Sequence, residues 1–227
     1  MVPIFLPVLL LALPALTDQY EREREIMVQT QIAERGVEDP ATLRAMRKVP
    51  RHLFLPESRV DRAYDDGPQP IGYGQTISQP YIVAAMTEVI RPRRGQRILE
   101  IGTGSGYQAA VLAEIVDTVY TIEIITELYQ SARSRLASLG YRNILTRNAD
   151  GYYGWEEAAP FDAIVVTAAA EHIPPPLVSQ LKEGGRMVIP VGSPFLVQTL
   201  MLVVKQEGKA TTESLMPVRF VPLTRGE

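Results

Sequence analysis

Cysteine is absent from the 227 residues of this chain, and histidine occurs only twice, as His52 and His172. The absence of cysteine excludes disulfides, thiolate metal ligands and a cysteine nucleophile. Two histidines fall short of the three or four protein ligands that zinc ordinarily takes, so we expect no metal site. The chemistry of the chain must therefore rely on hydroxyls, carboxylates, backbone groups or a cofactor.

An excess of charge of one sign is also lacking. The chain has 23 lysines and arginines against 26 aspartates and glutamates, for a formal net charge of -3. Without a basic surplus there is no long-range attraction for phosphates, so we expect no nucleic-acid partner. The length, with 46% hydrophobic residues, is enough for one α/β domain with a full core.

Residues 2–16 form an apolar N-terminal stretch. The stretch is shorter than the roughly 20 residues that span a bilayer, but it has the length of the apolar part of a secretory signal. It lacks a preceding basic residue and a clean cleavage site, which leaves a start-site artefact or a plain extension as alternatives. We expect an extension over residues 1–17 and a single domain over 18–227, with membrane contact only if the extension is a true signal or anchor.

The segment Arg97–Tyr107 holds a short apolar strand, then three glycines in five positions, before an alanine-rich helix. Such a turn brings backbone N–H groups and a helix N-terminus against a ligand. Gly102, Gly104 and Gly106 fit G-x-G-x-G, whereas a dinucleotide fingerprint would need its third glycine at position 107. We interpret the loop as a site for a nucleoside without a pyrophosphate, of which S-adenosylmethionine is the commonest.

Strands and helices alternate from residue 97 onward. The expected strands cover residues 97–101, 118–122, 143–147, 162–167 and 186–191, and the expected helices cover 107–115, 126–139 and 175–182. This alternation predicts an α/β fold with a mostly parallel, doubly wound sheet. Extended segments at 199–205 and 213–221 predict an antiparallel C-terminal edge. Helices at 18–35, 40–49 and 80–90 predict a helical N-terminal cap, and residues 65–77 read as a loop.

Polar residues follow successive strands of this sheet, where ligands of doubly wound folds bind. Glu123 stands 21 residues after Gly102, the spacing at which a carboxylate accepts hydrogen bonds from ribose hydroxyls. Asp150 and Gly151 follow the next strand, where the carboxylate can accept from an adenine amino group and the glycine lets the base approach. Thr167 ends the fourth strand. Each has an ordinary explanation as a turn or strand end, but together they predict one nucleoside site.

Five longer segments carry a resemblance to a known family: Val49–Phe54, Ile71–Pro80, Leu99–Tyr107, Phe161–Ala169 and Val218–Leu223. On these segments the chain resembles the protein-L-isoaspartate O-methyltransferases over residues 27–223. The decapeptide Ile71–Pro80 is the most diagnostic, because other methyltransferases share the glycine loop. Two departures stand out, since the family often has glycine at Ala149 and a small residue at Arg225.

The resemblance implies a Rossmann-like class I fold that depends on S-adenosylmethionine. It implies methylation of the α-carboxyl of L-isoaspartyl residues in damaged proteins, whose ester closes to a succinimide and partly reopens to aspartate. It implies Ser78 as the catalytic residue and Thr76, Ile77 and Val221 as substrate contacts. The implied cofactor contacts are Gly102, Thr103, Gly104, Gly106, Tyr107, Glu123, Asp150 and Gly151. The implied partners are isoaspartyl proteins and peptides, and we expect a cytoplasmic monomer, with export or tethering through residues 2–16 as the alternative.

A carboxylate acceptor suits a chain with few bases, because its pKa near 4 leaves it ionised at neutral pH. We therefore expect Ser78 to position the acceptor and not to form a covalent bond. The alternative for Ser78 is a helix N-cap before Pro80, with Gln79 as the other candidate cap.

Three other functions share parts of this pattern. A small-molecule or RNA methyltransferase can use the same fold, but no basic stripe or aromatic platform favours RNA. An NAD-dependent oxidoreductase conflicts with Tyr107 at the position of the third glycine. A non-catalytic S-adenosylmethionine-binding module would be expected to lose the segment 76–78, which is intact.

Overall fold

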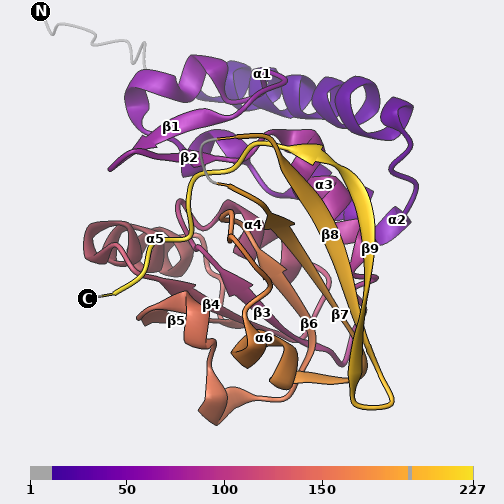
Figure 1. Cartoon of the computed structure of the whole chain (residues 1–227). Helices are drawn as coiled ribbons and strands as arrows, with labels where there is room; N and C mark the ends of the chain where they lie inside the picture. Colours follow the sequence, from indigo (N-terminus) through magenta and orange to yellow (C-terminus); the bar gives the residue numbers. More distant parts are fainter. Residues whose placement is uncertain (1–11, 194–195, 227) are drawn as a thin grey trace, which may run out of the picture.

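The centre of the molecule is a seven-stranded sheet with the strand order β5-β4-β3-β6-β7-β8-β9 (Figure 1). The computed structural model describes residues 12–193 and 196–226. The strands are β3 (Arg97–Ile101), β4 (Thr118–Glu123), β5 (Ile144–Asn148), β6 (Phe161–Val166), β7 (Leu181–Val191), β8 (Gln198–Gln206) and β9 (Lys209–Val218). Strands β3 to β7 pair in parallel, and β8 and β9 add antiparallel. The predicted mostly parallel sheet with an antiparallel C-terminal edge is confirmed.

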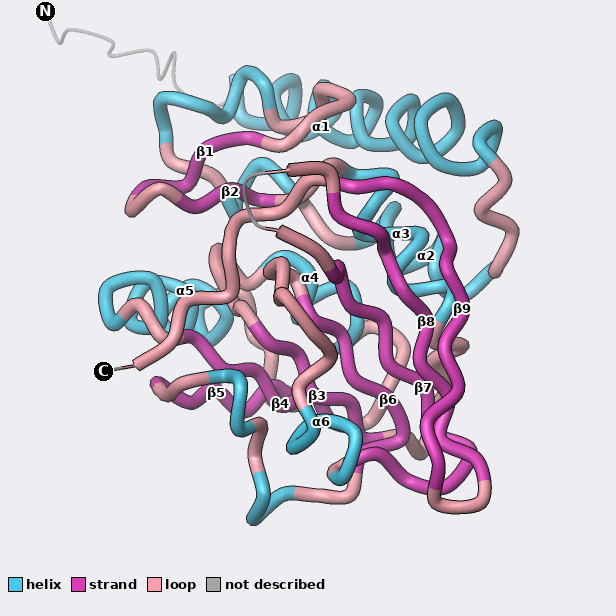
Figure 2. Tube along the Cα trace, in the orientation of Figure 1, coloured by secondary structure: helices cyan, strands magenta, loops and turns pink. Residues whose placement is uncertain are grey.

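The two central strands, β3 and β6, are buried on both faces, as their nearly continuous apolar sequences require. Ile98 points into the core on one face of the sheet, whereas Leu99 and Ile101 point into the core on the other. The first core lies beneath helices α3 (Pro80–Val89), α4 (Tyr107–Ala113) and α5 (Thr126–Ser138), and the second beneath α6 (Pro175–Ser179). Figure 2 shows helices on both faces of the sheet.

Helix α1 (Ala12–Ile26) begins within the stretch expected as an extension and continues through a π-helical turn and a 3₁₀ turn to Arg35. Gly36, with φ of 94°, ends this run. Helix α2 (Pro40–Lys48) has the expected cap, since the Asp39 side chain accepts a hydrogen bond from the Thr42 N–H at 2.7 Å. The expected signal or anchor at residues 2–16 lies mostly outside the described residues. None of the described helices combines the length and apolarity needed to cross a bilayer.

The segment expected as a loop over residues 65–77 contains a hairpin of β1 (Gln69–Gly72) and β2 (Gln75–Ile77). Its turn uses positive φ at Tyr73 and Gly74. The prolines and glycines of this segment predict a loop because they lower the propensity for strands. Burial of Ile71 and Ile77 nevertheless stabilises the pairing of β1 with β2. Strand β7 also starts earlier than expected, at Leu181, because its first residues pair with Phe161 before a register shift.

Candidate active site

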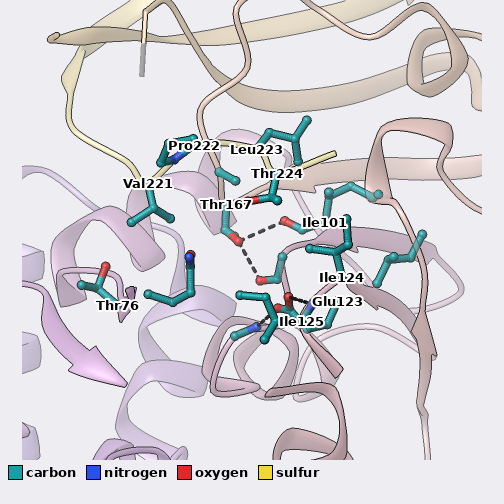
Figure 3. A pocket seen from close by; sticks show the side chains of 16 residues that line it. Thr76, Ile101, Glu123, Ile124, Ile125, Thr167, Val221, Pro222, Leu223 and Thr224 are labelled. Carbon is teal, nitrogen blue, oxygen red and sulfur yellow. Dashed lines mark hydrogen bonds between the residues drawn. The ribbon is translucent and has the colours of Figure 1, made fainter. Parts of the chain in front are cut away.

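The glycine loop between β3 and α4 adopts a backbone that other residues rarely take. Gly102, Gly104 and Gly106 have φ of 93°, 52° and 89°. A Cβ on Gly102 would lie 2.5 Å from the Thr167 Oγ1. The same Thr167 hydroxyl donates to the Ile101 carbonyl, at 3.0 Å, or the Gly102 carbonyl, at 2.8 Å (Figure 3). The end of β6 therefore fixes the loop, and glycine is required for the close approach.

Glu123, at the end of β4, faces this loop. Its Oε2 accepts from the Gly104 N–H at 2.8 Å, and its Oε1 accepts from the Ile125 N–H at 2.9 Å (Figure 3). The side chain is almost fully buried. Each carboxylate oxygen keeps lone pairs for a further donor, so the predicted ribose contact is compatible with the geometry.

Asp150 and Gly151 follow β5, beside the same edge of the sheet. Asp150 Oδ1 accepts from the Tyr152 N–H at 2.9 Å, and Oδ2 accepts from Arg225 Nε at 2.9 Å and the Gly226 N–H at 3.1 Å. Partial burial raises the pKa of Asp150, but these hydrogen bonds more than offset it, so the pKa lies below its ordinary value. A Cβ on Gly151 would lie 2.4 Å from an Ile101 side-chain carbon, so only glycine fits there.

Thr103 and Tyr107 were also expected to contact the cofactor. The Thr103 hydroxyl is buried and shares a hydrogen bond of 2.6 Å with the Thr121 hydroxyl. The Tyr107 ring packs edge-on against Phe54 in the core beneath α4. Both residues line the cavity along the glycine loop.

Glu100 is a candidate cofactor-binding residue that the sequence did not point to. Its side chain is fully buried, Oε2 accepts from the Thr121 hydroxyl, and Oε1 has no partner among the described residues. Burial, helped by the nearby Glu123 charge, raises the pKa of Glu100 to about 8. The signal was a carboxylate within an otherwise apolar strand, two residues before Gly102.

Three adjoining cavities surround these residues. The edge cavity lies beside Glu123 and Gly151 and is covered by Val221, Pro222, Leu223 and Thr224 (Figure 3). The inner cavity lies along the glycine loop and includes Glu100, Ile77 and Ser78. The large cavity, of about 440 Å³, includes Ser78 and Val218 to Val221, which belong to the two segments that the resemblance implied as the peptide site. Its lining also includes residues that the sequence did not point to as contacts: Pro68, Gln79, Ile82, Val197 and Pro217. Thr76 and Thr167 line all three.

Ser78 therefore stands at the junction of the inner and large cavities. It is not the N-cap of α3, because Gln79 occupies that position and no side chain caps the helix. No hydrogen bond holds the Ser78 hydroxyl within the described part of the chain, so the hydroxyl is available to a ligand. The expected substrate contact Ile77 is buried and faces the inner cavity.

These residues fit S-adenosylmethionine. The glycine cradle has no room for a side chain at Gly102, the Glu123 carboxylate suits a ribose, and the Glu100 oxygen that has no partner among the described residues suits a hydrogen-bonding group of the ligand. A parallel sheet in this order, with a glycine loop after β3 and a carboxylate after β4, defines a class I methyltransferase fold.

Comparison with solved structures supports that class. A protein-L-isoaspartate O-methyltransferase structure matches with a TM-score of 0.78 and 29% identity, covering 89% of this chain and 65% of the other. A second, from Plasmodium falciparum in complex with S-adenosyl-L-homocysteine, matches with a TM-score of 0.76 and 26% identity, covering 89% of this chain and 99% of the other.

The family model for protein-L-isoaspartate(D-aspartate) O-methyltransferase (PCMT) matches residues 22–227. A curated protein-L-isoaspartate O-methyltransferase 1 from Nitrosospira multiformis is 58% identical over 217 residues, which are 94% of this chain and 92% of the relative. A protein-L-isoaspartate O-methyltransferase from Opitutus terrae is 60% identical over 210 residues, which are 91% of this chain and 90% of the relative. The chain belongs to the protein-L-isoaspartate O-methyltransferase family. The predicted family, isoaspartate-repair activity and dependence on S-adenosylmethionine are confirmed.

Gly102→Ala should disrupt the loop for two reasons. The new Cβ would clash with the Thr167 hydroxyl, and alanine disfavours the positive φ at this position. Gly140→Ala is the matched control, since Gly140 has φ of 84° but open space around its Cβ. We expect Gly102→Ala to lose more stability than the control, by about 1 kcal/mol or more, and to bind S-adenosylmethionine more weakly. Urea unfolding and calorimetric titration measure the two effects; equal stability losses would contradict the account.

Glu100→Gln should change how stability depends on pH. In the folded chain Glu100 keeps its proton up to a pKa of about 8, whereas the unfolded chain loses it near 4.5. The folded state binds the extra proton between these values, so the free energy of unfolding of the wild type falls as pH rises through that window. Glutamine has no proton to lose, so the free energy of unfolding of the variant lacks this pH dependence. The variant should therefore gain stability relative to wild type as the pH rises towards about 8.

Urea unfolding across the window from about pH 5 to about pH 8 measures this difference. The exposed Glu127→Gln serves as the control, because it makes the same chemical change outside the buried site. Parallel stability curves for wild type and Glu100→Gln would show that Glu100 is already ionised in the folded chain.

Proposed function

We propose that the nucleoside of S-adenosylmethionine lies between the glycine loop, Glu123 and Asp150, and that an isoaspartyl carboxylate enters from the large cavity to meet its methyl group at Ser78. The observation that carries this proposal is the position of Ser78, which lines both the large cavity and the inner cavity along the glycine loop. Thr76 and Thr167 line the same two cavities. Donor and acceptor can therefore approach one another at this residue.

S-adenosylmethionine supplies a methyl group bonded to a positively charged sulfur, which a carboxylate can attack directly. The acceptor needs no general base, because it is ionised near neutral pH. The task of the chain is to hold the carboxylate oxygen in line with the methyl carbon and the sulfur, and alignment of this kind contributes several kcal/mol. One hydroxyl donor from Ser78 orients the carboxylate and leaves its second oxygen free to attack.

The histidines take no part in this chemistry. His52 Nδ1 is hydrogen-bonded to the Tyr64 hydroxyl at 2.8 Å, and the His52 ring stacks on Tyr20. His172 lies beside the Tyr152 hydroxyl at 3.3 Å. Neither is within the lining of the cavities that contain Ser78. This supports a positioning role for Ser78 over a role as an activated nucleophile.

The acceptor is an isoaspartyl protein or peptide of nearly any sequence. Thr76 and Val221 are the proposed contacts in the large cavity, and Ile77 is the proposed contact in the adjoining inner cavity. The extended backbone around Val221 would read a peptide through main-chain hydrogen bonds, which do not depend on its side chains. Specificity then comes from the extra methylene, which sets where the carboxylate falls.

Three further proposals complete this function. Residues 18–227 act as one domain, since the N-terminal helices pack into the same core as the sheet. The enzyme acts as a monomer. It works in the cytoplasm, where S-adenosylmethionine is made, and export through residues 2–16 is the alternative.

Ser78→Ala should lower kcat/KM for an isoaspartyl peptide by about 10- to 100-fold, the value of one hydrogen bond to a charged group. The affinity for S-adenosylmethionine should change little, because Ser78 lies at the acceptor end. Initial-rate kinetics and calorimetry measure these quantities, with the exposed Ser134→Ala on α5 as the matched control. Full kcat/KM in Ser78→Ala would remove the residue from the mechanism.

Glu123→Gln should weaken S-adenosylmethionine binding by about tenfold or more. The amide group of glutamine would set a donor against the N–H of Gly104 or Ile125, where the carboxylate now accepts. Glu127→Gln makes the same change four residues away on an exposed surface and should bind normally. Equal dissociation constants for the two variants would place the ribose elsewhere.

A further inference from the structure

The last residues of the chain form a strap across the edge cavity. This C-terminal strap, residues 219–226, leaves β9 and crosses the sheet towards α5 and β5 (Figure 1). Four of its residues, Val221 to Thr224, cover the side of the edge cavity opposite Glu123 (Figure 3). The strap thus lies over the proposed nucleoside site.

Three attachments hold the strap, and they differ in character. At its start, the Phe220 N–H donates to the buried Gln198 side chain at 2.9 Å. In its middle, Ala169 exchanges two backbone hydrogen bonds of 2.8 Å with Val221 and Leu223. Both attachments involve residues rooted in the core or the sheet.

The third attachment, at the end of the strap, is an ion pair near the surface. Arg225 Nε lies 2.9 Å from Asp150 Oδ2, with the arginine side chain 42% exposed and the aspartate 13% exposed. The Arg225 guanidinium also stacks 3.7 Å from the centre of the Tyr152 ring. The Gly226 N–H adds a bond of 3.1 Å to the same oxygen.

The strap closes one side of the edge cavity (Figure 3). On the far side this cavity adjoins the inner cavity, with which it shares Gly102, Gly104 and Thr167. The opposite wall is the glycine loop and Glu123, which the sheet holds rigidly. The strap is the wall that can yield, and its end at Arg225 is its most solvent-accessible attachment.

We propose that Arg225 is a positioning residue that clasps the strap over the bound nucleoside and holds the Asp150 carboxylate ready for the adenine. This inference rests on the proposed nucleoside site. Opening of the clasp admits and releases the nucleoside, and its closure, on the Tyr152 ring and the Asp150 carboxylate, retains it.

The Asp150 carboxylate has enough acceptor sites for both Arg225 and an adenine. Arg225 and Gly226 both donate to Oδ2, whereas Oδ1 accepts only from the Tyr152 N–H within the described structure. A carboxylate oxygen accepts two hydrogen bonds, so Oδ1 retains a site for an adenine amino group. The guanidinium also keeps the carboxylate ionised, which strengthens its acceptance.

The test is the rate at which tritiated S-adenosylhomocysteine leaves the full-length protein after a chase with unlabelled ligand. Arg225→Ala should release it about fivefold faster or more, the combined value of an exposed ion pair and a cation–π contact. Arg225→Lys keeps the charge but not the planar stack on Tyr152, so its release rate should lie between those of wild type and Arg225→Ala. Arg142→Ala removes another exposed arginine, away from the site, and should match wild type.

Ionic strength separates a clasp from a merely structural role. Release from wild type should accelerate with added salt, because salt screens the exposed pair, whereas release from Arg225→Ala should be fast and nearly independent of salt. Thermal unfolding of each variant checks that the fold is intact.

Two results would overturn the clasp: tighter binding by Arg225→Ala, which would make the arginine a competitor of the adenine, or release rates equal to those of Arg142→Ala. Failure of the wild type to bind S-adenosylhomocysteine at all would instead overturn the proposed nucleoside site.

Discussion

The close approach of β6 to the glycine loop is the constraint on which the site depends. The Thr167 hydroxyl stands where a side chain at Gly102 would have to be, and it hydrogen-bonds to a carbonyl of the same turn. This contact directs the loop so that the Gly104 N–H meets the Glu123 carboxylate. Neighbouring strands of one parallel sheet supply all of these groups, so a buried, apolar sheet gives the site its rigidity.

Carboxylates supply most of the charge in this site, and each is held differently. Glu123 is fixed by two backbone N–H groups, and Asp150 is fixed by the Arg225 guanidinium and the Gly226 N–H. Glu100 is buried and keeps its proton up to a pKa of about 8, so it is a hydrogen-bonding group at neutral pH and adds no charge. Such a set suits a ligand with hydroxyl, amino and cationic groups. Neither histidine lines the described cavities that contain Ser78, in agreement with an acceptor that arrives already ionised.

The sequence predicted the parts of this arrangement that depend on local pattern. The succession of strands and helices along the chain followed from periodicity, and the placing of the glycine loop, Glu123 and Asp150 at one edge followed because a parallel sheet gathers its carboxyl ends there. The β1–β2 hairpin did not follow, because Pro70, Gly72 and Gly74 dominate its composition while tertiary burial of Ile71 and Ile77 decides its structure. The contact of Arg225 with Asp150 spans 75 residues and depends on the path of the strap, which no local pattern records.

The decisive measurement is methyl transfer from labelled S-adenosylmethionine to two peptides that differ only in one L-isoaspartyl or L-aspartyl linkage. We predict base-labile label on the isoaspartyl peptide alone, because only the extra methylene brings a carboxylate to Ser78 and the methyl donor. Label on neither peptide, with S-adenosylmethionine binding intact, or equal label on both would contradict the account.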